Sequence, residues 1–586
     1  MDRRRFVTSL SGGALGAGAG SSFAGGILFP GVLWAHAQAA GEITAAVVAR
    51  ASELVGLSFT DAQIDALLSR LESHRTSYAQ IRATSLPPDL PPSLTFDPGA
   101  LLSTAPSSAP SAGDPPGDPS PEPSGVRSNG LPGRAPSASA ERPASDVDLA
   151  FLPVTDLADL LRSGQVSSME LTELFLDRLR RHDPELECVV TLTGELAREQ
   201  AARADEELAR GVDRGPLHGI PWGAKDLLAV RGYPTTWGAA PYRNQVLDYD
   251  ATAVRRLEEA GAVLVAKLTL GALAMGDVWF GGRTRNPWNL EEGSSGSSAG
   301  SAAATAAGLV PFALGSETLG SIVSPSTRCG VTGLRPTFGR VSRHGAMPLS
   351  WRMDKLGPLA RNAEDCALVL GAIHGADGQD PAARSVGFTW DPERPARQLR
   401  VGFYRAGFES DDVTALDRRV LEVLRQMGLD LVPVDLPDGL PTEALRVILF
   451  AEAGAAFDQL TRSERIDELG RQDEGAWPNV FRAARFIPAV EYIQANRIRT
   501  RILRELETSL EGVDALVTPS YADPVLLMTN LAGHPAVLVP NGFEDDGTPV
   551  GITFVGRLWG EADILALARA YQDETGFHRS RPPRFG

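Results

Sequence analysis

The chain contains lysine at only three positions, Lys225, Lys267 and Lys355, and arginine supplies all its other permanently basic side chains. Arginine keeps its proton at physiological pH, whereas a desolvated lysine can lose its proton and act as a base. We therefore interpret the three lysines as candidates for positions that require a titratable or compact amine. At each of them, a purely structural packing role is the alternative.

Serines flanked by glycines are concentrated in residues 293–333, which read GSSGSSAGSAAATAAGLVPFALGSETLGSIVSPSTRCGVTG. Residues 301–308 carry only small side chains and predict a helix that is deeply buried against other backbones. The apolar run 309–314 then leads into a second Gly/Ser turn that ends at Ser321. A serine at the end of a buried element can serve as a nucleophile when a base lies nearby. A flexible Gly/Ser linker is disfavoured, because the helix and the apolar run are embedded in the stretch.

A rival motif overlaps this stretch. Residues 296–300 match G-x-S-x-G, the strand-turn-helix nucleophile motif of α/β-hydrolases, with Ser298 as the nucleophile. That motif requires a buried strand directly before it, but residues 285–292 are mostly polar and include a proline. It also requires a histidine base, and the eight histidines are scattered along the chain. We therefore rank this alternative lower.

The elements that must position these residues follow from the hydrophobic pattern beyond residue 147. Helical patterns alternate there with short β-branched runs, which predicts an α/β fold with a large and mostly buried sheet. Residues 147–586 contain no second linker, so we expect them to form one catalytic domain. The clearest helices are expected at 167–181 and 192–209, and the clearest strands at 262–266, 400–403 and 515–519.

The N-terminus has the pattern of an export signal. Arg3, Arg4 and Phe6 form a twin-arginine motif, and an uncharged Gly/Ala-rich stretch follows at residues 8–34. Residues 35–37, Ala-His-Ala, offer a small-x-small cleavage site. We expect residues 1–37 to be a twin-arginine signal peptide and the mature protein to be periplasmic or secreted; an uncleaved anchor is the alternative.

Two further segments precede the catalytic domain. Residues 43–83 look helical: Thr60 and Gln63 form a capping box, and an apolar stripe follows at Ile64, Leu67, Leu68 and Leu71. Two short helices cannot bury this stripe alone, so we expect them to dock on the main domain or on a second copy in a homodimer. The layout loosely resembles the small helical subunit of tRNA-dependent amidotransferases. Residues 84–146 are rich in Pro, Ser, Ala and Gly and predict a flexible linker.

Composition excludes several function classes. The formal net charge of −17 disfavours a nucleic-acid partner, because an acidic surface repels phosphates. Beyond the N-terminus no segment has the length and apolarity of a membrane span, so no membrane partner is expected after signal cleavage. The three cysteines, Cys188, Cys329 and Cys366, lie far apart and lack metal-ligand spacing, which predicts buried free thiols.

Several motifs occur in the order and spacing of one enzyme family. On these motifs, residues 148–586 resemble the amidase signature family. The resemblance implies a large mixed β-sheet covered on both sides by helices, and a site without metal or cofactor. The motifs are GIPWGAKD at 219–226, GSSAGSA at 296–302, GSI at 320–322, CGVTGLRPTFGRVS at 329–342, DKLGP at 354–358, TP at 518–519, NLAGHPA at 530–536 and PVGI at 549–552.

The resemblance also implies a catalytic triad. The family's nucleophile falls on Ser321, its bridging serine, preceded by a cis peptide, on Ser297, and its lysine on Lys225. Lys225 has apolar neighbours, and burial there would leave a neutral amine that takes a proton through Ser297 and returns it to the departing nitrogen. Lys267 and Lys355 also lie in family motifs, with structural roles. The implied oxyanion hole consists of the backbone N–H groups of Thr318, Leu319, Gly320 and Ser321.

The chain departs from the family pattern around the nucleophile. Where the family has Asp-x-Gly-Gly-Ser-Ile-Arg, this chain has Glu317, Leu319 in place of a glycine, and Val323 in place of the arginine. The changes at Glu317 and Val323 are linked if the family's aspartate and arginine form an ion pair in relatives. Leu319 either prevents the positive φ that only glycine adopts easily at this position, or its side chain narrows the active site. Other residues expected to shape the pocket are Trp279 and region 440–495, where Trp477, Phe481 and Phe486 are more typical of core.

These observations predict an exported amidase that hydrolyses linear carboxamides through a serine acyl-enzyme, with a small-molecule amide as its partner. Within the same chemistry, the alternative is an esterase, carbamate or aryl-acylamide hydrolase. A tRNA-dependent amidotransferase subunit of the A type ranks lower, because export and acidity argue against it. A catalytically dead binding protein ranks lower as well, because all three triad positions are filled. The sequence leaves the substrate-binding residues unknown.

Overall fold

The computed structural model describes residues 43–87, 92–94 and 141–586. The predicted signal peptide, residues 1–37, lies outside the described residues, as does most of the predicted linker. The chain divides into a small unit, residues 1–64, and a large unit, residues 65–586. Within the described residues, no helix combines the length and apolarity needed to cross a membrane.

The small unit contains helix α3 (Ala45–Leu54) and the start of helix α4 (Asp61–Ala83). Thr44 caps α3, since its side chain accepts the backbone N–H of Val47. The predicted capping box at α4 is confirmed: the Thr60 N–H donates to Gln63 Oε1 (3.0 Å), and the Gln63 N–H donates to Thr60 Oγ1 (3.3 Å). The rest of α4 belongs to the large unit.

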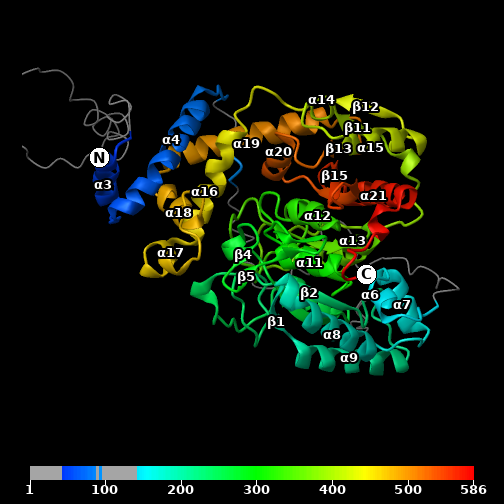
Figure 1. Cartoon of the computed structure of the whole chain (residues 1–586). Helices are drawn as coiled ribbons and strands as arrows, with labels where there is room; N and C mark the ends of the chain where they lie inside the picture. The colour runs from blue at the N-terminus through cyan, green and yellow to red at the C-terminus, as the bar shows by residue number, and fades with distance from the viewer. Residues whose placement is uncertain (1–42, 88–91, 95–140) are drawn as a thin grey trace, which may run out of the picture. The chain divides into compact units, whose positions relative to one another are not determined.

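An 11-stranded mixed sheet runs through the large unit, in the order β1-β3-β2-β8-β10-β9-β14-β15-β13-β11-β12 (Figure 1). Neighbours β3, β2 and β8 are parallel, as are β13, β11 and β12, whereas the strands between them pair antiparallel. The strands are β1 (Val189–Leu192), β2 (Pro221–Lys225), β3 (Val263–Leu268), β8 (Phe312–Glu317), β9 (Thr332–Arg335), β10 (Lys355–Ala360), β11 (Val401–Tyr404), β12 (Leu431–Val434), β13 (Ala515–Pro519), β14 (Ala536–Phe543) and β15 (Pro549–Gly556). Two small hairpins lie outside this sheet, β4 (Val278–Trp279) with β5 (Gly282–Arg283), and β6 (Arg285–Asn286) with β7 (Asn289–Gly293).

Helices cover both faces of the sheet, which confirms the predicted α/β fold. One group shares a buried core with β3 and β8, and it consists of α8 (Ser168–Leu186), α9 (Gly194–Ala209), α11 (Ala299–Ala306) and α12 (Val323–Cys329). A second group packs against β3, β9, β10, β14 and β15, and it consists of α10 (Thr252–Glu259), α13 (Ala363–Ile373) and α21 (Glu561–Thr575). Every residue of α11 is buried, as its small side chains predict.

The remaining helices lie around this core. Short helices precede the first strand, at α6 (Asp146–Ala150) and α7 (Val154–Arg162), and α14 (Arg405–Glu409) and α15 (Ala415–Gln426) accompany the last strands. A separate helical layer, coloured yellow to orange in Figure 1, contains α16 (Arg446–Ala456), α17 (Asp458–Thr461), α18 (Trp477–Ala484), α19 (Ala489–Ser509) and α20 (Val525–Ala532). Trp477, Phe481 and Phe486 are buried in this region, as expected of core residues.

Candidate active site

Lys225 ends strand β2, and its ammonium nitrogen lies among three serine hydroxyls. Its Nζ is 2.8 Å from Ser297 Oγ, 2.9 Å from Ser298 Oγ and 2.9 Å from Ser316 Oγ. Strand β2 pairs in parallel with β8, so the carboxyl ends of both strands meet at one edge of the sheet. That register brings Ser316 of β8 to the lysine, while Ser297 and Ser298 come from the turn before α11.

The lysine is fully buried, and burial lowers its pKa well below the ordinary value. The carboxylates of Asp354 and Glu317 oppose this shift by favouring the charged form, but they do not cancel it. All the groups that accept from Nζ are neutral oxygens. The arrangement therefore favours a neutral amine, which can accept a proton.

The bridging position has the backbone geometry that the sequence predicts. The peptide bond between Gly296 and Ser297 is cis, and Ser297 is almost completely buried. A side chain at Gly296 is impossible in this geometry, since its Cβ would lie 1.9 Å from the carbonyl oxygen of Gly276. Ser297 is thus fixed with its hydroxyl against Lys225.

Ser321 lies in the turn between β8 and α12. It is 9% exposed, compared with 1% for Ser297, so of the two hydroxyl-bearing residues it is the more accessible. Its carbonyl oxygen accepts the N–H of Ser298 at 3.1 Å, which ties its turn to the bridging segment. Within the described residues its own hydroxyl has no hydrogen-bond partner. The structure therefore brings the three predicted triad positions to one edge of the sheet.

The backbone N–H groups of Thr318, Leu319, Gly320 and Ser321 donate to no acceptor within the part of the chain that the structure describes. Such unpaired donors next to a nucleophile are what an oxyanion requires. In this segment only Gly320 has a positive φ, at +78°. The half-buried Leu319 therefore occupies a conformation that needs no glycine, which explains why the departure from the family pattern is tolerated.

Glu317 is paired, although Val323 stands where the family has an arginine. Its carboxylate accepts Arg335 Nη1 at 2.8 Å and Asn530 Nδ2 at 2.8 Å. Its second oxygen accepts the N–H groups of Ile322 and Val323, at 2.8 and 3.0 Å. Burial opposes its ionisation, but the cations of Arg335 and Lys355 outweigh burial and lower the pKa of this carboxyl to about 2. Glu317 thereby anchors the first residues after Ser321.

The other two lysines have buried partners of their own. Lys267 forms an ion pair with Asp226 (2.6 Å), and Lys355 donates to Asn530 Oδ1 (2.8 Å). Their amines contact no part of the triad, in agreement with the structural roles expected from the sequence.

Asp354 is a site residue to which the sequence analysis assigned no role. Its Oδ1 accepts the hydroxyl of Thr318 at 2.6 Å, and its Oδ2 accepts the N–H groups of Leu349 and Ser350 at 2.8 and 2.9 Å. Burial raises the pKa of this carboxyl, and these hydrogen bonds partly offset the effect. Asp354 fixes the first residue of the predicted oxyanion segment.

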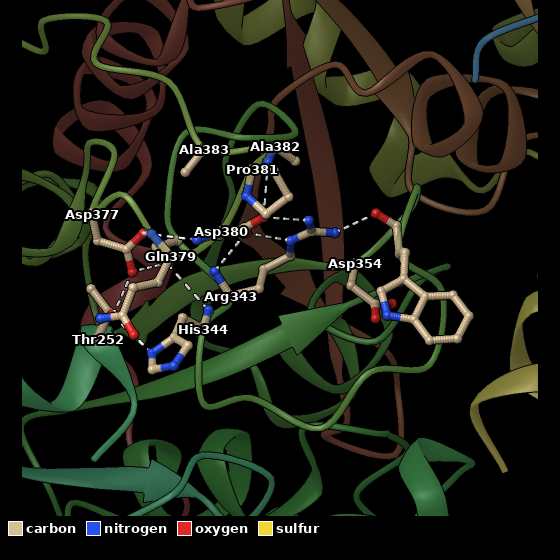
Figure 2. Close-up of polar contacts among 12 residues, drawn as sticks. Thr252, Arg343, His344, Asp354, Asp377, Gln379, Asp380, Pro381, Ala382 and Ala383 are labelled. Atoms are coloured by element: carbon tan, nitrogen blue, oxygen red, sulfur yellow. Dashed lines mark hydrogen bonds and ion pairs between the residues drawn. The ribbon is translucent and has the colours of Figure 1, made fainter. Parts of the chain in front are cut away.

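Asp354 also borders a cavity of about 200 Å³ whose lining includes Ser316 and Thr318. Figure 2 shows Arg343 and Asp380 beside Asp354, where Arg343 Nε and Nη2 each lie 2.8 Å from a carboxylate oxygen of Asp380. The lining of the cavity therefore includes an arginine and an aspartate, Arg343 and Asp380, whose charges are paired with each other. Ser316 and Asp354 were missed as site residues because nothing in the sequence shows that these positions lie near Lys225, and Ser298 was considered only as a rival nucleophile.

The rival nucleophile motif does not fit the geometry. Ser298 Oγ is engaged by Lys225 and by both backbone groups of Ser316, at 3.1 Å each. The preceding segment forms strand β7, which is short and mostly half-exposed, in agreement with the expectation of no buried strand. It belongs to a two-stranded hairpin outside the main sheet. The three cysteines are buried and free, as expected.

Curated proteins similar to this chain are named as A subunits of glutamyl-tRNA(Gln) amidotransferase. The chain is 37% identical over 484 residues to the glutamyl-tRNA(Gln) amidotransferase A subunit of Roseiflexus castenholzii, covering 74% of this chain and 97% of that protein. It is 36% identical over 489 residues to the protein of the same name from Moorella thermoacetica, covering 74% of this chain and 99% of that protein.

These relatives overturn the predicted ranking of functions. The sequence analysis placed an exported hydrolase of linear amides above an amidotransferase subunit of the A type, on the grounds of export and acidity. That ranking is wrong, because the chain matches curated amidotransferase proteins of the A type over nearly their whole length. Net charge describes only the surface of one chain and does not report on the other members of an assembly.

Among solved structures, the chain is similar to a peptide amidase from Stenotrophomonas maltophilia, with 32% identity, a TM-score of 0.66, and coverage of 75% of this chain and 99% of that one. The family model described as Amidase matches residues 170–529. This match includes Lys225, Ser297 and Ser321. The chain therefore belongs to the amidase signature family, whose members act on carbon–nitrogen bonds.

Proposed function

We propose that this protein is the amide-cleaving component of an amidotransferase, of the A type. It removes the amide nitrogen from a primary carboxamide through a serine acyl-enzyme and supplies it to an acceptor carboxyl group within an assembly. The single observation that carries the chemistry is the fully buried Lys225 side chain, whose Nζ lies 2.8 Å from Ser297 Oγ. The choice of an amidotransferase rests on the relatives' names and on the extent of the match.

The proposed reaction begins with proton transfer from Ser321 through Ser297 to the Lys225 amine. The Ser321 oxygen then bonds to the carboxamide carbon, and the N–H groups of residues 318–321 stabilise the oxyanion. When the tetrahedral intermediate collapses, the C–N bond breaks and the Lys225 ammonium returns its proton through Ser297 to the nitrogen, which leaves as ammonia. Water then cleaves the Ser321 ester, releasing the carboxylic acid and restoring the hydroxyl.

A lysine base suits an amide leaving group. An amide nitrogen leaves only when it is protonated, so the group that accepts the serine proton must also be able to donate it. A lysine whose pKa is lowered by burial can meet both requirements, because its neutral form accepts a proton and its charged form donates it.

Replacement of the native A-type component in a reconstituted Moorella thermoacetica amidotransferase tests this proposal. With glutamine as the donor and glutamyl-tRNA(Gln) as the acceptor, we expect ammonia release and amidated tRNA from the assembly containing this chain. The Ser321→Ala variant should assemble but release no ammonia. Ammonia release without amidated tRNA or stable assembly would contradict the amidotransferase assignment, and no turnover of any carboxamide would contradict the proposed chemistry.

A further inference from the structure

Helix α4 ends at Ala83, whereas the family match begins only at residue 170. The curated relatives cover 74% of this chain while almost their whole length is matched, and the family model begins at residue 170. The unmatched quarter corresponds in length to the residues before the catalytic domain. The part of α4 beyond residue 64 nonetheless belongs to the same compact unit as the catalytic residues. Most of a helix that lies outside the family match is therefore part of the same compact unit as the catalytic residues.

A buried stripe on α4 faces the helical layer. Leu67, Leu71, His74, Tyr78 and Ile81 are all buried, and they recur every three or four residues along one side of the helix. This spacing extends the predicted stripe through Leu67 and Leu71 by three further turns.

Specific contacts join the stripe to α16, α18 and α19. The ring of His74 stacks on Phe450 of α16, with 5.8 Å between centroids. The hydroxyl of Tyr78 donates to the carbonyl oxygen of Phe486, just after α18, at 3.4 Å. Arg82 Nε lies 2.7 Å from Glu491 of α19. Since Glu491 is buried, this pair is better shielded from solvent than a surface ion pair.

The two contacted helices α16 and α19 meet at Glu452, two residues from Phe450. Tyr492, next to Glu491, donates its hydroxyl to Glu452 Oε1 at 2.6 Å. Glu452 Oε2 in turn accepts the hydroxyl of Ser350 at 2.7 Å. The same carboxylate also accepts Arg352 Nη1 at 2.8 Å. Glu452 is almost fully buried, so it holds loop 349–354 from the side of the helical layer.

Loop 349–354 leads directly to the oxyanion segment. The N–H of Ser350 donates to Asp354 Oδ2 at 2.9 Å, and Asp354 Oδ1 accepts Thr318 Oγ1 at 2.6 Å. Contacts of α4 with α16 and α19, the backbones of these two helices, and hydrogen bonds from Glu452 onward therefore connect Arg82 and His74 to Thr318, three residues before Ser321.

We propose that α4 is a positioning element for the active site. By holding α16 and α19 together, it fixes Glu452 and loop 349–354, and through Asp354 it fixes the backbone donors of residues 318–321. This inference rests on the proposed function only in requiring Ser321 to be the nucleophile. Because α4 contacts no reacting group, its effect is on the acylation rate, with ground-state binding unchanged.

The test uses the full-length chain and the rate at which a fluorophosphonate labels Ser321, a readout that needs no substrate or partner. The double variant Tyr78→Ala/Arg82→Ala removes two contacts of α4, and Ser73→Ala on its exposed face is the matched control. We expect labelling to slow by about tenfold in the double variant and to stay unchanged in the control. Glu452→Gln should slow labelling similarly, and its combination with the double variant should add less than the product of the two effects.

Hydrogen exchange and substrate kinetics separate positioning from loss of folding. In the double variant we expect faster exchange in residues 349–354 and 318–321, with β2, β3 and α11 unchanged, and a lower kcat for glutamine in the assembly at constant KM. A double variant that docks α4 loosely yet labels at the wild-type rate would overturn the inference. Absence of labelling in the wild-type protein would instead refute the proposed function, so the two failures are distinguishable.

Discussion

Lys225 is the residue whose environment most directly determines the chemistry. It is one of three lysines in the chain, and it lies in a completely buried position with only neutral oxygens around its amine. Because burial lowers its pKa, the neutral amine that acts as the base is more readily populated than in an exposed lysine.

Replacing Lys225 by methionine should lower kcat by about a thousandfold, since a positioned general base typically contributes 10²–10⁴. Arginine at this position should not restore activity, because a guanidinium keeps its proton. In the wild-type protein, activity should be lost as pH falls through the lowered pKa of Lys225 and should be constant above it. An ascending limb centred near the ordinary lysine value in the pH profile of Ser321 labelling would contradict this assignment.

Glu317 makes an acid-dependent contribution to stability. Its pKa in the folded protein is about 2, below the ordinary value of 4.5, so its contribution is fully present above pH 4.5 and is lost as pH falls from 4.5 towards 2. The difference corresponds to roughly 3 kcal/mol. We therefore expect Glu317→Gln to be less stable than the wild type at pH 7, in urea unfolding, and the gap to narrow between pH 4.5 and 3. A gap that is constant over this range would show that the ion pair with Arg335 does not titrate in this way.

At the scale of elements, the small residues of α11 allow the helix to approach neighbouring backbone. A Cβ added at Gly300 would lie 2.4 Å from the carbonyl oxygen of Cys188 and 2.5 Å from the nitrogen of Thr269. Such distances require the backbone of α11 or of its neighbours to move. The position of Ser297, three residues earlier, depends on this close approach.

Gly300→Ala should therefore destabilise the protein by about 1–3 kcal/mol, even though alanine is the better helix former by about 1 kcal/mol. Gly470→Ala is the matched control, because its added Cβ meets no atom within 4 Å. Urea unfolding measures both, and Ser321 labelling should slow only in Gly300→Ala. Equal stability of the two variants would mean that α11 can shift without cost.

At the scale of the whole molecule, the net charge of −17 sets a limit on what this chain does alone. An acidic chain repels phosphates, so in the proposed amidotransferase we expect other subunits to hold the tRNA. We expect fluorescence anisotropy of labelled tRNA to show no binding by the isolated chain at about 0.1 M salt, even at protein concentrations of about 10⁻⁴ M, the weak end of ordinary non-specific affinity. Tight binding by the isolated chain would contradict this division of labour.

The sequence by itself determined the fold class, and its motifs predicted which residues form the triad. Alternating helical and strand-like segments predicted the α/β sheet, and strands 262–266, 400–403 and 515–519 appear as β3, β11 and β13 within a few residues. Local patterns suffice to predict these elements, because the strand tendency of a β-branched run and the capping at Thr60 depend on residues close by in the sequence. The prediction of a triad came from the motifs around Lys225, Ser297 and Ser321, through their resemblance to the amidase signature family.

Tertiary structure decided which other groups meet these residues. Ser316 and Asp354 reach the site because β2, β8 and β10 are neighbours in the sheet, an order that no local pattern encodes. Arg335 pairs with Glu317 for the same reason, since β9 carries it there from the separate motif at residues 329–342. The docking of α4 likewise depends on contacts between residues about 400 positions apart. The sequence predicted an apolar stripe on this helix but not the residues that it contacts.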